Sequence, residues 1–152
     1  MSRHRTYLAF GILVIGGLLG CDPLYGMRVR QSLAPVPSLA CIDNALGASP
    51  LVREVIPFPA ASERDAVQAR VRLAGRGSDE AIAVVDRDST GIGALFTWIH
   101  VHEPSAADKS RLRAASEAML RDVVRACAPA DTLHFECRIT GPFTDRSCPQ
   151  AG

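Results

Sequence analysis

Two histidines separated by one residue form the most chemically suggestive segment of the chain, His100-Val101-His102-Glu103. In a β-strand, residues two apart point to the same face, which is the arrangement of H-x-H metal ligands. A metal site needs a third ligand, which His134 or Glu103 would supply only if the fold brought it near. We expect no metal here, and keep a metal-binding protein or metal-dependent enzyme using His100 and His102 as the alternative hypothesis.

A second polar segment, Asp86-Arg87-Asp88-Ser89-Thr90, follows an apolar run. Its D-x-D-x-T pattern resembles the nucleophile motif of haloacid-dehalogenase-type phosphatases, in which the first Asp attacks phosphate and the second is the acid and base. That family places further basic and acidic residues on later parallel strands, whereas only one helix and two strands of an antiparallel sheet are expected after this segment. We therefore interpret the segment as a polar hairpin turn ending at Gly91.

Aromatic and histidine side chains share one face of the strand expected over residues 92–102. The four positions are Phe96, Trp98, His100 and His102. This face is a candidate binding surface, because Trp and Phe concentrate at protein interfaces. The alternative is that the helix expected over residues 105–127 covers it, since buried Trp is common in small cores. We expect Trp98 to be largely buried and the partner surface to lie elsewhere.

Hydrophobic periodicity indicates two helices and about five strands. Ser38 is the candidate N-cap of a short helix ending near Gly47, and Ser105 that of a long helix ended by Pro129. Alternating or continuous apolar character indicates strands. They are expected at residues 51–58, 67–73, 81–85, 92–102 and 133–139. Short turns favour antiparallel neighbours, so the fold class is α+β, an antiparallel sheet of about five strands with two helices packed on it.

Composition and charge fit one globular domain. The chain has 152 residues, of which 47% are hydrophobic and 22% charged, and these values suit a single domain with a buried core. The formal net charge is only +1. A bulk electrostatic nucleic-acid binder is therefore disfavoured, and we expect no nucleic-acid partner.

The first residues combine the features of an export signal. Arg3 and Arg5 precede an uncharged stretch over residues 6–20, whose length as a helix, about 22 Å, is less than the roughly 30 Å of a hydrocarbon core. The stretch leads into Leu18-Leu19-Gly20-Cys21, which resembles the lipobox of bacterial lipoproteins. The resemblance implies a signal peptide over residues 1–20 and a mature chain that begins at an acylated Cys21.

The same resemblance implies a protein of the cell envelope, attached to a membrane through lipid on Cys21 and facing the periplasm. Asp22 resembles an inner-membrane retention signal, so the inner membrane is slightly favoured over the outer membrane. Residues 21–37 are expected to be a lipidated N-terminus and tether reaching about 22 Å, with a short edge strand over residues 27–30 as the alternative. A globular domain over residues 38–140 and a tail over residues 141–152 are expected to follow.

Four cysteines remain once lipid occupies Cys21: Cys41, Cys127, Cys137 and Cys148. In an oxidising compartment they are expected to form two disulfides. We favour Cys41–Cys127 with Cys137–Cys148, because Gly141-Pro142 can reverse the chain between the second pair. The alternative is Cys41–Cys137 with Cys127–Cys148.

The sequence carries no signature of nucleophilic catalysis. It contains no G-x-S-x-G motif and no Gly-rich phosphate loop before a helix. We therefore expect an envelope lipoprotein that is not an enzyme and needs no cofactor. Its small domain is expected to bind a periplasmic or envelope protein, as an accessory subunit or as an immunity-type inhibitor.

Overall fold

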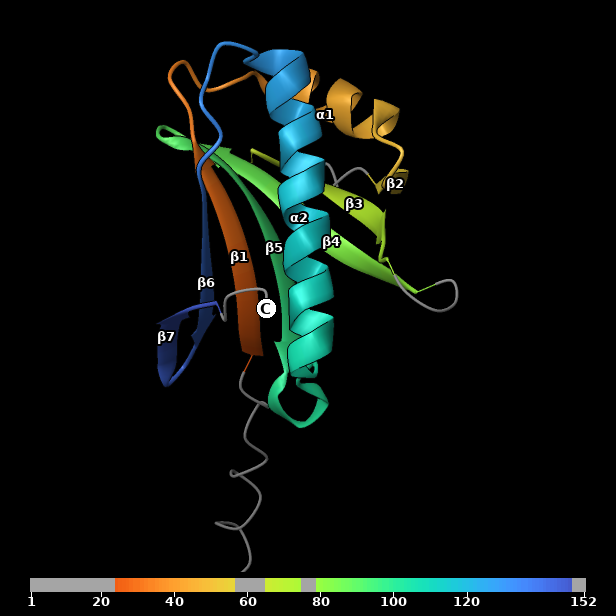
Figure 1. Ribbon diagram of the computed structural model, residues 1–152, viewed down its shortest axis with the longest axis vertical. Coiled ribbons are helices and arrows are strands. Elements are labelled where there is room, and N and C mark those ends of the chain that lie inside the picture. The colour runs from red at the N-terminus through yellow and green to blue at the C-terminus, as the bar shows by residue number, and fades with distance from the viewer. Residues whose placement is uncertain (1–23, 57–64, 75–78, 149–152) are drawn as a thin grey trace, which may run out of the picture.

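The computed structural model describes residues 24–56, 65–74 and 79–148 of the chain, with the side chain of His100 excepted. These residues form one antiparallel sheet with one short and one long helix on one of its faces (Figure 1). The expected α+β class, with two helices on an antiparallel sheet, is confirmed. The sheet has seven strands rather than about five.

The strands lie in the order β2-β3-β4-β5-β1-β6-β7, and every neighbouring pair is antiparallel. Their bounds are β1 Leu24–Ser32, β2 Val52–Ile56, β3 Ala66–Arg72, β4 Glu80–Asp88, β5 Gly91–Ile99, β6 Phe135–Gly141 and β7 Thr144–Ser147. Strands β2 to β5 follow one another through hairpins. Strand β1 lies between β5 and β6 and pairs with both, so it is an interior strand of the sheet.

The expected tether over residues 21–37 is wrong from Leu24 to Ser32, because these residues form β1. This strand is hydrogen-bonded to a neighbour on each side. The alternative of a short edge strand is therefore also wrong. Met27 and Val29 are fully buried, whereas Arg28 and Arg30 alternate with them on the opposite face. The globular domain therefore begins before residue 38.

Both helices begin where their capping residues predict. Helix α1 spans Leu39–Ala48, and the Ser38 hydroxyl accepts a hydrogen bond from the Cys41 backbone N–H at 3.2 Å. Helix α2 spans Ala106–Cys127, and the Ser105 hydroxyl accepts from the Asp108 backbone N–H at 3.1 Å. Each bond satisfies a backbone donor that has no partner within the helix. No helix of the described residues is long and apolar enough to span a bilayer.

The core lies between the helices and one face of the sheet. Helix α2 packs on β1 and β5, and α1 packs on β2 and β3. Gln31 is one of the buried polar residues, and its amide donates to the Thr132 carbonyl at 3.0 Å and accepts from the His134 backbone N–H at 2.7 Å. Because a buried amide must be satisfied, this pair of bonds fixes the loop between α2 and β6 to β1.

Two disulfides, Cys41–Cys127 and Cys137–Cys148, confirm the favoured pairing. The first joins α1 to the end of α2 across 86 residues, and the second closes a hairpin of 11 residues. Loop-closure entropy gives the long loop about 4–5 kcal/mol of stabilisation and the short loop about 3 kcal/mol. The expected tail over residues 141–152 is wrong in part, because Thr144–Ser147 form β7 against β6.

Candidate functional site

The sheet face opposite the helices carries several charged side chains that pair from one strand to another. We call it the open face, since α1 and α2 both pack on the other side (Figure 1). Strand alternation assigns its residues, because neighbours along a strand point to opposite faces. They include Arg28, Arg30, Glu54, Arg70, Glu80, Ile82, Val84, Asp86, Asp88, Leu95, Arg138 and Asp145.

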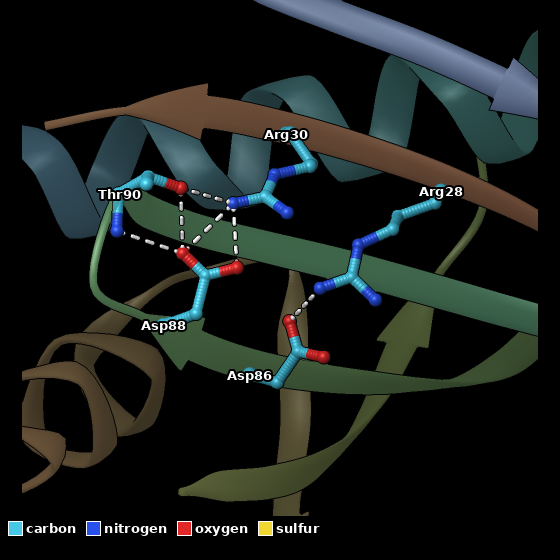
Figure 2. Close-up of polar contacts among 5 residues, drawn as sticks. All are labelled: Arg28, Arg30, Asp86, Asp88 and Thr90. Atoms are coloured by element: carbon cyan, nitrogen blue, oxygen red, sulfur yellow. Dashed lines mark hydrogen bonds and ion pairs between the residues drawn. The ribbon is translucent and has the colours of Figure 1, made fainter.

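One ion pair on the open face reaches across a whole strand. The Arg28 guanidinium of β1 donates to Asp86 of β4 at 2.6 Å, and β5 lies between them (Figure 2). Gly93 of β5 makes room for the contact, because a Cβ there would lie 3.1 Å from both Arg28 Nε and Asp86 Oδ1. Both side chains are less than a third exposed. The pair is therefore held against the sheet rather than free in solvent.

A second pair lies beside the first at the β4–β5 turn. Arg30 donates to the two carboxylate oxygens of Asp88 at 2.9 and 2.7 Å and to the Thr90 hydroxyl at 2.8 Å (Figure 2). Thr90 in turn donates to Asp88 from its hydroxyl and its backbone N–H. The Thr90 hydroxyl, then its N–H and the Arg30 guanidinium, hold the pKa of Asp88 well below its usual range.

These contacts settle the structural role of the Asp86–Thr90 segment. The predicted hairpin is confirmed, because β4 ends at Asp88 and β5 begins at Gly91. Asp86 and Asp88 both point onto the open face, and each carboxylate accepts a hydrogen bond from an arginine of β1. In the structure, the two aspartates of the D-x-D-x-T pattern therefore form ion pairs at the protein surface.

A third charge cluster lies toward the β2 edge. Glu80 contacts Arg53 at 2.5 Å and Arg70 at 3.9 Å, and Arg70 also reaches Glu54 at 3.3 Å. The hydrogen bond from Arg53 lowers the pKa of Glu80, although burial opposes the shift. Charges of both signs are therefore matched across neighbouring strands here as well.

Between these charge clusters the open face is apolar. Ile82 is 50% exposed, and Val84 and Leu95 are half-buried. Val84 pairs directly with Leu95, and Ile82 pairs with Arg70. An apolar centre with a polar border that contains arginines is similar to the apolar core and polar rim of protein interfaces.

The expected burial of Trp98 is confirmed, and the candidate binding surface is wrong for Phe96 and Trp98. Phe96 and Trp98 are only 3% and 8% exposed, because they lie on the core face of β5 beneath α2. Tyr25 of β1 stacks on Trp98 with ring centroids 6.4 Å apart, and the Lys109 ammonium lies 6.0 Å from the indole centroid. The interpretation that the long helix covers this face is the one that the structure supports.

The two histidines do not lie on a strand. Strand β5 ends at Ile99, and residues His100–His102 form a short 3₁₀ turn, so the two-residue rule for a shared face does not apply. His102 is exposed, and the side chain of His100 lies outside the described part of the chain. No group of three or more His, Cys, Asp or Glu side chains that could hold a metal occurs among the residues described.

Sequence reasoning missed the arginines that organise the open face. Arg28 and Arg30 were assigned to a tether, although they alternate with Met27 and Val29. That period of two was the available signal, and it was too short to outweigh the neighbouring prolines and glycine.

The lipobox and Asp22 lie outside the described residues, so lipidation at Cys21 stays a prediction. Comparison of the chain with protein-family models, with curated proteins and with solved structures found no match in any of the three.

Proposed function

We propose that the protein is a cell-envelope lipoprotein, anchored through Cys21, whose periplasmic domain binds a protein partner through the open face of its sheet. The observation that carries the binding role is the composition of that face. An apolar centre of Ile82, Val84 and Leu95 is bordered by arginines whose charges are already matched by carboxylates. Neutralised borders reduce the desolvation cost of docking, and arginine is enriched at protein interfaces.

The anchoring role rests on the first 21 residues. A short uncharged stretch after Arg3 and Arg5 ends at Leu18-Leu19-Gly20-Cys21, in the order of a lipoprotein signal. More than one acyl chain is needed for stable anchoring, and a lipoprotein cysteine carries at least two. Asp22 favours the periplasmic face of the inner membrane. Within this setting the partner is an envelope protein, with the domain as accessory subunit or immunity-type inhibitor.

Anchoring is tested by replacing the acylated thiol. Cys21→Ser should abolish labelling of the protein by a radioactive fatty acid in growing bacteria, because serine offers no thiol for acylation. The matched control is Ser2→Cys in the Cys21→Ser background, which restores a cysteine outside the motif and should stay unlabelled. Equal labelling of wild type and Cys21→Ser would contradict the lipoprotein proposal.

Partner binding is tested at the apolar centre of the open face. Ile82→Glu should lower capture of a cross-linked envelope protein from membranes by about tenfold, because it charges the contact region. The fold should persist, since the new carboxylate would lie opposite Arg70 in the sheet register.

The matched control for this experiment is Ala114→Glu, which makes the same charge change at an exposed position of α2. It should leave capture unchanged. Loss of capture in the α2 variant, with retention in Ile82→Glu, would move the binding surface to the helical side and contradict our assignment.

A further inference from the structure

Three large apolar side chains are exposed at one end of the sheet. Leu24 begins β1, Val101 lies in the 3₁₀ turn after β5, and Phe143 lies in the β6–β7 turn. Their exposed fractions are 59%, 67% and 90%. Exposed aromatic and aliphatic side chains that cluster mark contact sites rather than ordinary surface.

The sheet register places the three side chains at the same level. Leu24 pairs with Ile99, two residues before Val101. Gly26 pairs with Thr140, so the turn that carries Phe143 lies beside the start of β1. In Figure 1 the start of β1 and the β6–β7 hairpin both lie at the lower end of the sheet, with the 3₁₀ turn below α2.

This end of the sheet is also the end at which the anchor joins the domain. Cys21 lies three residues before Leu24. Three residues span at most about 11 Å even when fully extended. The tether length of about 22 Å expected for residues 21–37 therefore does not separate the lipid from the domain, because most of that segment is β1.

We propose that this end of the sheet docks on the lipid bilayer, with Leu24, Val101 and Phe143 entering the region between headgroups and acyl chains. The inference rests on the lipidation of Cys21 in the proposed function. Burial of apolar area at the lipid surface stabilises such contacts. Two carboxylates near this end, Glu103 and Asp145, are paired with Lys109 and Arg138, which reduces their repulsion from anionic lipids.

The opposite end of the sheet has a different surface. Ser32, Ser89 and Thr90 are exposed there, around the β4–β5 turn. The nine residues of β5 separate the two ends, and at 3.3 Å per residue this is a distance of about 30 Å. Docking by the apolar end would orient the strands roughly along the membrane normal. A partner in the same membrane would then contact the open face from the side.

The experiment places a new fluorophore at each end of the full-length lipidated protein. Phe143→Trp and Ser89→Trp proteins are purified from membranes and reconstituted into phosphatidylcholine vesicles with or without brominated acyl chains. Bromine quenches tryptophan only near contact. We expect the emission added by Phe143→Trp to fall about twofold or more in brominated vesicles, and the emission added by Ser89→Trp to stay unchanged. Wild type, with buried Trp98, supplies the background.

Fatty-acid labelling of the same preparations separates the two proposals. If the protein is labelled but neither added tryptophan is quenched, docking is overturned while the lipoprotein proposal stands. If Phe143→Trp emission is blue-shifted yet insensitive to bromine, a protein covers this end, and docking is likewise overturned. Absence of label in wild type overturns the anchor and, with it, this inference.

Discussion

Gly91→Ala is expected to destabilise the domain by about 3 kcal/mol or more. A Cβ at this position would lie 2.1 Å from the backbone carbonyl oxygen of Gln31 and 2.9 Å from the Cα of Ser32. These atoms belong to β1, which pairs with β5 at the centre of the sheet. Backbone cannot turn away as a flexible side chain can, so β1 and β5 must separate. Urea denaturation followed by circular dichroism measures the cost.

The same substitution at Gly47 is the matched control and should have the opposite sign. Gly47 is exposed in α1, and a Cβ there would meet nothing within 4 Å. Alanine in a helix is favoured over glycine by about 0.5–1 kcal/mol. Equal stability of Gly91→Ala and wild type would contradict the close approach of β1 to β5.

The features that depend on residues close together in the sequence, the helix N-caps and the short-range disulfide, were predicted correctly. Ser38 and Ser105 cap the helices as expected, because an N-cap is settled by one hydroxyl and a nearby backbone N–H. The disulfide of Cys137 with Cys148 followed from the turn between them. Helix α1 runs to Ala48, one residue past the end expected near Gly47, and the Ser49 backbone N–H caps it by donating to the Leu46 carbonyl.

Strand β1 was expected only as an alternative, a short edge strand over residues 27–30, because its composition resembles a linker. Gly26 contributes to that impression, yet its place in the strand is set by packing: a Cβ there would lie 2.9 Å from the Leu95 side chain of β5. The pairing of β1 between β5 and β6 joins residues far apart in the sequence. Alternation over a few residues indicates a strand, but it does not indicate which neighbours the strand will have.

The open face was hidden for a related reason. Arg28–Asp86 and Arg30–Asp88 are each 58 residues apart in the chain, so the pairs exist only after β1 has entered the sheet. On β5 both faces carry apolar residues, and alternation alone could not decide which side α2 would cover. Burial of Trp98 was expected only because buried tryptophan is common in small cores, and not from the pattern of the strand itself.

Truncation of Trp98 is the second change expected to have a large effect. Trp98→Ala should lower the free energy of unfolding by about 3–5 kcal/mol, because it opens a cavity between β5 and α2. This is a large share of the roughly 5–15 kcal/mol that stabilises a domain of ordinary size. The stacked Tyr25 and the nearby Lys109 would lose their contact with the indole. Urea denaturation followed by circular dichroism avoids dependence on the lost fluorophore.

Trp98→Phe separates the role of the ring from that of its N–H. The indole Nε1 is buried without a hydrogen-bond acceptor among the described residues, so its removal relieves an unpaired donor while most of the ring contact remains. We expect a cost below about 1.5 kcal/mol, since the replacement is smaller but still aromatic. If Trp98→Phe proved as costly as Trp98→Ala, the N–H would have to be bonded. If both were harmless, Trp98 would lie at the surface, and the aromatic face of β5 would again be a candidate for binding.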